Sequence, residues 1–339
     1  MWYSMYSRDW TEAMLAYATS RDGLNWKKPN LGLIEYQGSQ DNNLIFGSPR
    51  QPTREEIELD PTMAPPGGTR FEGAWVIKDP VETVPARRYK MLFRGPPRLA
   101  YYMVNAAYSP DGVHWTFYKE NPAIPLRSDT ANNVFWDPRI ERYVVFVRLF
   151  AASGQVDPSS DPADPGHLRI VGRSESRDFV NWTPAEVVLI PDEKDQEARG
   201  TLHDMQVLQY ESVYFGFLGI NRKFKVESSK PQDASEEHIE THTTAAEAES
   251  EDVELTFSRD GVRWIRAGEH QRFMALQKPY DHTPEWIQIF QPPLIVGDEI
   301  WFYYNGIDSV YDPNPLPPPK QPLLDSYGDN YNLAVALAK

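Results

Sequence analysis

The sequence predicts an all-β protein, a five-bladed β-propeller of four-stranded antiparallel blades. Three observations predict it: a seven-residue turn motif occurs four times, a strand–turn–strand pattern recurs between its copies, and helical periodicity is nearly absent from the 339 residues. The motif tryptophans follow one another at intervals of 89, 67 and 82 residues. Short antiparallel strands repeated at such intervals are typical of propeller blades.

The repeated motif has the pattern Ser-x-Asp-Gly-x-x-Trp, an Asp-box. Its aspartate accepts hydrogen bonds from its own turn, its glycine takes a positive φ, and its tryptophan returns to the sheet and fills an apolar slot. We therefore assign the aspartates and tryptophans a structural role. The copies occupy residues 20–26, 109–115, 176–182 and 258–264, the third with Phe179 in place of glycine.

The strand pairs lead to the blade count. Pairs are expected at 71–78 with 88–94, 134–136 with 143–148, 205–209 with 213–218, and 293–296 with 300–305. Only residues 2–7 and 13–19 precede the first motif copy, so we expect the first blade to lack its innermost strand. The last pair has no motif copy after it and makes the count five. Asp79-Pro80 and Asp137-Pro138 fall between paired strands, and we interpret both as turns.

We expect residues 1–339 to form one domain with an acidic insertion, disordered or in a loop, at 227–254. That segment contains ten acidic residues and a single basic residue, Lys230, so it accounts for nine of the 15 excess negative charges. An acidic chain is a poor partner for nucleic acid or an anionic membrane surface. No apolar stretch reaches the ~20 residues of a membrane span, and no signal peptide is visible, so the localisation stays open. The sequence also leaves the oligomeric state open.

The absence of cysteine excludes disulfides, thiolate metal sites and cysteine nucleophiles. The sequence also lacks a P-loop, a dinucleotide fingerprint and an H-E-x-x-H motif. We expect neither a cofactor nor a metal.

Candidate chemistry lies where inner strands begin and second strands end, because these ends meet at one face of a propeller. Hydrolysis of a glycosidic bond needs one carboxyl group as proton donor and a second as nucleophile or base. We predict Glu72, Asp204 and Glu285 as the catalytic carboxylates, with acid and base roles left open. The predicted sugar-binding residues are Arg94, Asn133, Arg148, His203 and Trp286.

Other interpretations stay open. Carboxylates at strand ends also cap loops or pair with arginines. The chain could be a non-catalytic carbohydrate-binding propeller, for which carboxylates much more than ~10 Å apart would argue. It could also be a sialidase-like Asp-box hydrolase, which needs three arginines on one substrate carboxylate and normally has six blades.

Three stretches resemble a known group. Residues 17–36 with the Gly-Ser-Gln-Asp-Asn-Asn run at 38–43, Ile-Lys-Asp-Pro at 77–80 with Arg-Tyr-Lys at 88–90, and residues 297–304 are similar to bacterial proteins of the glycoside hydrolase family 32-like branch. The resemblance implies a five-bladed propeller of the wider group with families 43, 68 and 117. It also implies hydrolysis of a fructoside, an arabinoside or a related sugar. The W-M-N-D-P-N-G and E-C motifs of invertases are absent, so the catalytic residues of invertases are not carried over.

Overall fold

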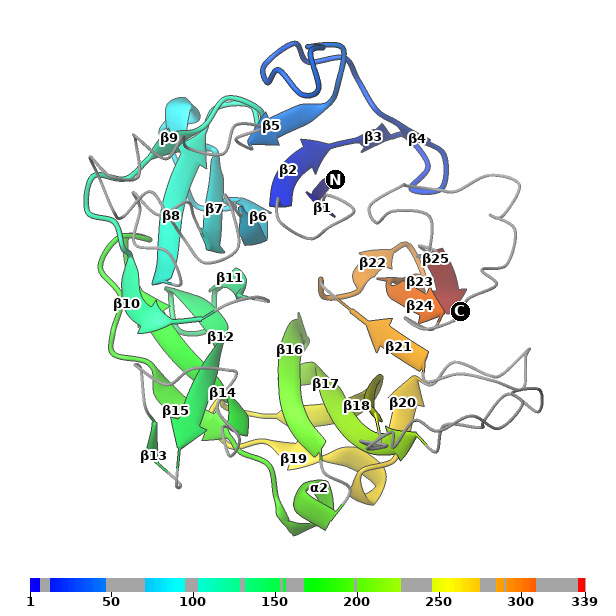
Figure 1. The fold of residues 1–339 in the computed structure, drawn as a ribbon. Coiled ribbons are helices and arrows are strands. Elements are labelled where there is room, and N and C mark those ends of the chain that lie inside the picture. Colours follow the sequence, from blue (N-terminus) through cyan, green and yellow to red (C-terminus); the bar gives the residue numbers. More distant parts are fainter. Residues whose placement is uncertain are drawn as a thin grey trace, which may run out of the picture.

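The computed structural model describes most of the sheet-forming chain, namely residues 1–6, 13–46, 71–94, 103–128, 132–152, 155–156, 168–197, 200–226, 246–274, 285–289, 291–308 and 335–338. The described part of the chain is all-β, with 58% of its residues in strands and 4% in helices. Its sheets surround a central axis in a propeller arrangement with four recognised blades (Figure 1). This confirms the predicted fold class, but not the count of five. No helix in the described ranges is long and apolar enough to cross a membrane.

The first sheet has three strands in the order β1-β2-β5, next to a small β3–β4 hairpin. The turn motif follows the third strand in the next two blades but follows the second strand here, so β1 and β2 occupy the places of second and third strands. Among the described residues β1 is the edge strand of this sheet, and the absence of an innermost strand from the first blade stays a prediction. The strands are β1 (Trp2–Tyr6), β2 (Ala13–Tyr17), β3 (Thr19–Ser20), β4 (Trp26–Lys27) and β5 (Leu44–Phe46).

The second and third blades each contain four main strands in antiparallel order and one short extra strand. The second comprises β6 (Glu72–Lys78), β7 (Tyr89–Arg94), β8 (Met103–Ser109), β9 (Thr116–Phe117) and β10 (Ile124–Arg127), with the turn η2 (Pro85–Arg87) between β6 and β7. The third comprises β11 (Asn133–Asp137), β12 (Arg142–Ala152), β13 (Gln155–Val156), β14 (Leu168–Ser176) and β15 (Glu186–Leu189). Their alternating apolar side chains pack between the blades, with Leu92, Val145 and Phe179 fully buried in one cluster.

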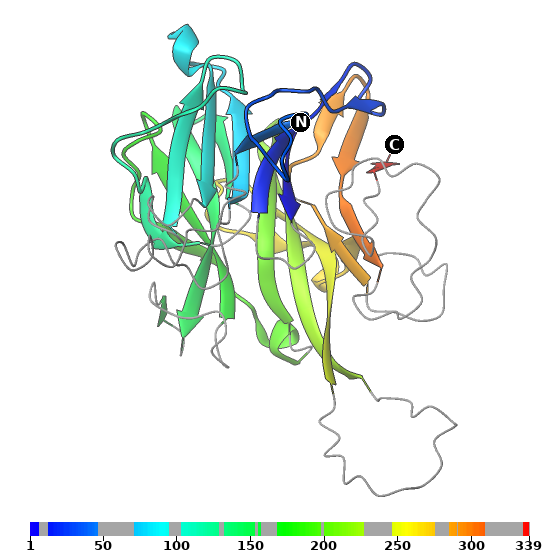
Figure 2. The same ribbon diagram turned by 45° about the horizontal axis from the view of Figure 1, so that its top comes forward.

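The fourth blade contains the longest strands, β17 and β18, which extend below the ring in Figure 2. Its elements are α2 (Glu193–Glu197), β16 (Gly200–Tyr210), β17 (Val213–Val226), β18 (Ala246–Ser258), β19 (Ile265–Arg266), η4 (Ala267–Glu269) and β20 (Arg272–Met274). Strand β18 corrects the predicted acidic insertion, because residues 246–254 pair with β17 in register instead of forming a loop. Residues 227–245 of that segment lie outside the described residues.

The last strands divide between two sheets. Strands β21 (Glu285–Gln288) and β24 (Asn305–Asp308) join the fourth blade through a parallel pairing of Glu251 with Trp286. Strands β22 (Leu294–Val296), β23 (Glu299–Tyr303) and β25 (Val335–Ala338) form a separate three-stranded sheet. The expected pairing of 293–296 with 300–305 forms as β22 with β23, whereas Asn305 belongs to β24 and pairs with β21 in the other sheet.

The four repeated turns share one hydrogen-bond pattern. In the first copy the Asp22 carboxylate accepts from the backbone N–H groups of Leu24 and Asn25, and Trp26 Nε1 donates to Gly23 O. The same bonds recur in the other three copies. The accepted bonds hold the pKa of these aspartates below its usual range, at about 2 for Asp178 despite the opposing effect of its partial burial.

Each repeated turn also contacts the sheet before its own. Arg139 of the third blade donates to Arg259 O of the fourth, and Lys90 of the second lies 5.6 Å from the Phe179 ring centroid of the third. Trp2 Nε1 donates to Gly112 O over 2.6 Å. Tyr303 in the last sheet donates to Gly23 O of the first turn over 2.8 Å, which closes the circle.

Substitutions at two glycines with the same φ distinguish the effect of backbone strain on stability from the effect of a steric clash. Gly112 and Gly38 both have φ +80°, but a Cβ on Gly112 would lie 2.6 Å from Trp2 Cζ2, whereas nothing lies within 4 Å of one on Gly38. We expect Gly38→Ala to lower the free energy of unfolding by about 1–2 kcal/mol through strain alone. Gly112→Ala should lower it further, because the indole must move. Urea unfolding of both variants tests this, and equal losses would contradict it.

Candidate functional site

A β-bulge in β16 brings two consecutive predicted residues to one place. Leu202 pairs with Ile220 and Asp204 with Gly219, so His203 is the extra residue of the bulge. Side chains normally alternate between the two faces of a strand, and a bulge interrupts that alternation. His203 and Asp204 therefore join one buried group with Glu251 of β18, in which one ligand-type atom from each residue lies within 4.8 Å of the others.

Two side chains contact the Glu251 carboxyl group, one on each oxygen. His203 Nδ1 lies 3.1 Å from its Oε1, and Gln288 Nε2 of β21 donates to its Oε2 over 3.1 Å. Gly219 of β17 makes room for both carboxyl groups. A Cβ there would lie 2.5 Å from Asp204 Oδ1 and 2.8 Å from Glu251 Oε1. The site therefore needs glycine at position 219 for the two carboxyl groups to approach each other.

The pair is buried, with Asp204 4% and Glu251 2% exposed. Burial, together with the neighbouring negative charge of Glu251, raises the pKa of Asp204 to about 6, against the effects of His203 and Arg148. Arg148 Nε also donates to His203 O over 2.6 Å and so fixes the backbone of the bulge. A carboxyl group with this pKa is protonated in mildly acidic solution and can donate a proton.

Two predicted sugar-binding residues belong to this group or contact it, and two others lie on neighbouring strands. His203 touches Glu251, and Arg148 holds the bulge. Asn133 begins β11 and accepts from the Val207 N–H of β16 over 3.0 Å. Arg94 is the last residue of β7, buried and opposite Glu72 in the register.

The other three predicted residues are placed by their backbone only. Glu72 begins β6 beside a bulge that contains Gly73 at φ 59°. Glu285 begins β21, and Trp286 pairs with Glu251. Their side chains lie outside the described part of the structure, so their roles stay predictions.

Sequence reasoning missed Glu251 and Gln206. Glu251 fell in the stretch interpreted as an insertion, although Glu251, Val253, Leu255 and Phe257 continue the period-two alternation of the predicted strand backwards. That alternation indicates that the strand already begins at or before Glu251.

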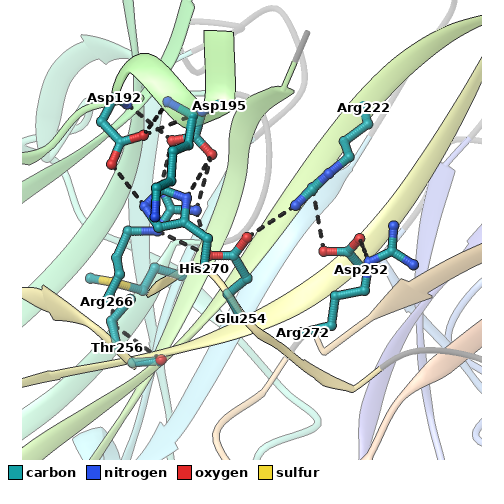
Figure 3. A network of polar contacts seen from close by, with 12 residues as sticks. Asp192, Asp195, Arg222, Asp252, Glu254, Thr256, Arg266, His270 and Arg272 are labelled. Carbon is teal, nitrogen blue, oxygen red and sulfur yellow. Dashed lines mark hydrogen bonds and ion pairs between the residues drawn. The ribbon is translucent and has the colours of Figure 1, made fainter. Parts of the chain in front are cut away.

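A second polar network ties α2 to the outer side of the fourth blade (Figure 3). Arg266 binds both carboxylate oxygens of Asp195 and also contacts Glu254. Arg222 continues the network from Glu254 to Asp252, which Arg272 also contacts. Asp192, Asp195 and His270 could together hold a cation. Because the Arg266 guanidinium already occupies both oxygens of Asp195, the arrangement fits an ion-pair network better than a metal site.

The two Asp-Pro sequences are structural turns, as interpreted from the sequence. Asp79 accepts from Tyr143 of the third blade over 2.6 Å, and Asp137 accepts from Tyr214 of the fourth. Burial and the adjacent aspartate raise the pKa of both tyrosines above their usual range. Lys90 completes the first contact with a buried 2.5 Å ion pair to Asp79. These aspartates join neighbouring blades away from the carboxylate pair.

Neither a family model nor a curated protein matches the chain. Similar solved structures include a glycoside hydrolase family 32 β-fructofuranosidase of Bombyx mori (12% identity, TM-score 0.44, covering 74% of this chain and 43% of that one). They also include a sucrose-6-phosphate hydrolase of Lactobacillus gasseri (13%, TM-score 0.43, 71% and 41%). A glycosyl hydrolase of Bacteroides ovatus is a third (12%, TM-score 0.43, 72% and 62%).

The chain spans less than half the length of the first two of these proteins. At this identity and TM-score the similarity assigns neither a substrate nor catalytic residues to it. Structural neighbours of this chain are family 32 fructofuranosidases, a sucrose-6-phosphate hydrolase and other glycoside hydrolases of propeller fold.

Proposed function

We propose that the protein hydrolyses a glycosidic bond, with Asp204 as the proton donor and Glu251 as the second carboxylate. The observation that carries the proposal is the buried pair itself, in which an oxygen of each residue lies within 4.8 Å of the other and the pKa of Asp204 is raised to about 6. Two neighbouring carboxyl groups with different environments are the usual arrangement for dividing acid and base roles.

The environments favour this division of roles. Gln288 Nε2 donates to Glu251 over 3.1 Å and His203 Nδ1 lies 3.1 Å from it, whereas Gln206 Nε2 donates to Asp204 over a longer 3.4 Å. Asp204 would protonate the leaving glycosidic oxygen while Glu251 attacks the anomeric carbon. Asp204 would then take a proton from the water that releases the sugar from Glu251.

The short separation favours a reaction with retention of configuration. Retaining enzymes hold their carboxyl groups about 5–5.5 Å apart, and inverting enzymes about 6.5–9.5 Å apart to admit a water. We expect the first-formed sugar to keep the anomeric configuration of the substrate. Proton NMR of the product in the first minutes of hydrolysis measures this, and an inverted product would assign Glu251 a different role.

The remaining predicted residues and the fifth blade belong to the same proposal. Strands β21–β25 would form a fifth blade whose inner strand is broken between β21 and β22. Glu72 and Glu285 would supply a third carboxylate, while Arg94, Arg148, Asn133 and Trp286 bind the sugar. The fructoside or arabinoside class rests on the sequence resemblance.

Activity should depend on pH through Asp204. A general acid works only when protonated, and the pKa of Asp204 is about 6 in the folded protein. We expect kcat to be insensitive to this group below pH 6 and to fall about tenfold per pH unit well above it. Measurement of kcat from pH 4 to 9 shows whether it falls in this way. Constant kcat from pH 5 to 8 would exclude Asp204 as the acid.

A substrate screen tests the function itself. Aryl fructosides, arabinosides, galactosides and sialosides are incubated with the protein and with variants Asp204→Asn, Glu251→Gln, Glu72→Gln and Glu285→Gln. The expected result is hydrolysis of one class that Asp204→Asn and Glu251→Gln abolish. Turnover equal to wild type in both of these variants would overturn the site, and turnover of sialosides alone would favour the sialidase-like interpretation.

One observation favours a second function, a non-catalytic carbohydrate-binding propeller. Asp204 and Glu251 are at most 4% exposed, and a buried carboxyl pair also suits a purely structural role. Binding of a sugar by calorimetry, without turnover in the same screen, would support this alternative.

A further inference from the structure

We infer that Asn133 and Gln206 form a subsite for a hydroxyl group beside Asp204, with Asn133 as its donor and Gln206 as its acceptor. Both side chains are completely buried. Within the described residues, Asn133 Nδ2 and Gln206 Oε1 have no hydrogen-bond partner. The inference rests on the proposed function in one respect, since it takes the hydroxyl to belong to the sugar cleaved at Asp204.

The other atom of each amide fixes its orientation. Asn133 Oδ1 accepts from Val207 N over 3.0 Å, which brings this amide to the peptide bond between Gln206 and Val207. Gln206 Nε2 lies 3.4 Å from Asp204 Oδ2. Along β16 from Asp204, the proposed proton donor, the side-chain amide of Gln206 therefore comes first. The side-chain amide of Asn133, which belongs to β11, comes next at Val207.

The two unpaired atoms are complementary to one chemical group. Asn133 Nδ2 can only donate and Gln206 Oε1 can only accept, whereas a hydroxyl both accepts and donates. A buried amide atom without a partner is unfavourable, so its removal offsets part of the stability that the substitution otherwise loses. Substitution of an amide that binds a ligand should therefore weaken ligand binding more than stability. Substitution of an amide with a structural role should lower stability and leave binding unchanged.

Two variants and a control separate these roles. Gln206→Met removes the unpaired acceptor and keeps the volume, and it also removes the long 3.4 Å hydrogen bond from Gln206 Nε2 to Asp204 Oδ2. Asn133→Asp keeps the oxygen that Val207 N–H needs and removes the donor. Gln209→Met, on the same strand, removes an amide that donates to Asp137 over 3.2 Å. Thermal unfolding of all four proteins is followed with and without D-fructose, L-arabinose or D-galactose, which requires no turnover.

We expect one of these sugars to stabilise the wild type and Gln209→Met, the latter from a lower starting Tm. Gln206→Met should lose less Tm without sugar than Gln209→Met does, because the hydrogen bond it loses is longer and an unpaired buried acceptor is removed with it. It should bind the sugar about tenfold more weakly, the effect of one buried hydrogen bond. Asn133→Asp should also bind about tenfold more weakly. A Gln206→Met variant that is destabilised like Gln209→Met and keeps the sugar response would overturn the subsite.

A crystal structure soaked with the same sugar decides the geometry. The expected result is a sugar oxygen within hydrogen-bond distance of both Asn133 Nδ2 and Gln206 Oε1. A water at that position under saturating sugar, or two amides bonded to each other, would overturn the inference. If the sugar occupies the subsite and no glycoside is hydrolysed, the subsite stands and the proposed hydrolysis fails.

Discussion

Asp204→Asn is expected to lower kcat by about 10²–10⁴-fold on glycosides with poor leaving groups, because an amide cannot protonate the departing oxygen. Glu251→Gln should cause a loss at least as large for every leaving group, since the amide neither attacks the anomeric carbon nor balances its developing charge. An activated aryl glycoside separates the two, because its leaving group needs little protonation and should partly restore Asp204→Asn alone.

The matched control for both variants is Asp252→Asn. Asp252 follows Glu251 on β18, is similarly inaccessible at 6% exposure, and pairs with Arg222 and Arg272 on the outer side of the blade. We expect this variant to lose stability and to retain kcat. The double variant Asp204→Asn/Glu251→Gln should be little slower than Glu251→Gln alone, because groups that act in one step are not additive. A loss of kcat in Asp252→Asn as large as that in Glu251→Gln would remove the case for a specific carboxylate pair.

Arg266→Met should lower the free energy of unfolding by about 3–5 kcal/mol, the usual effect of removing one partner from a buried ion pair. Arg266 is the shared cation of Asp195 and Glu254, whose side chains are 1% and 0% exposed, and no other described arginine reaches Asp195 (Figure 3). Methionine keeps the aliphatic length, so the loss reports on charge and hydrogen bonding. Urea unfolding followed by tryptophan fluorescence measures it.

Arg263→Met is the control from the same hairpin. Arg263 pairs with Asp260, but its side chain is 90% exposed. Exposed ion pairs contribute little, so we expect a change of less than about 1 kcal/mol. Equal losses in the two variants would mean that the network around Arg266 stabilises no more than a surface pair does.

The repeats in the sequence were sufficient to predict the propeller, because each turn motif encodes its own hydrogen bonds and Phe179 adopts the positive φ of the glycine it replaces. The number of blades did not follow from them. The break between β21 and β22 depends on which sheet each half joins, and this depends on tertiary pairing with β18.

The candidate site was only partly predictable for the same reason. Asp204, His203 and Arg148 could be found because strand order places their positions near one end of the blades. Glu251 could not be found in this way, because it comes from a third strand and reaches the site across Gly219. The bulge at His203 also has no local sequence indication, since it depends on the register between β16 and β17.

The contact of every repeated turn with the sheet before it makes the ring a head-to-tail assembly inside one chain. Such heterologous contacts form a closed ring only when the rotation per unit returns to its start. Three of the joints connect neighbouring stretches of sequence, but the seam between Tyr303 and Gly23 links residues 280 apart. Contacts of such separation carry the largest loop-closure entropy. The seam is therefore the joint expected to form last in folding and to open first under denaturant.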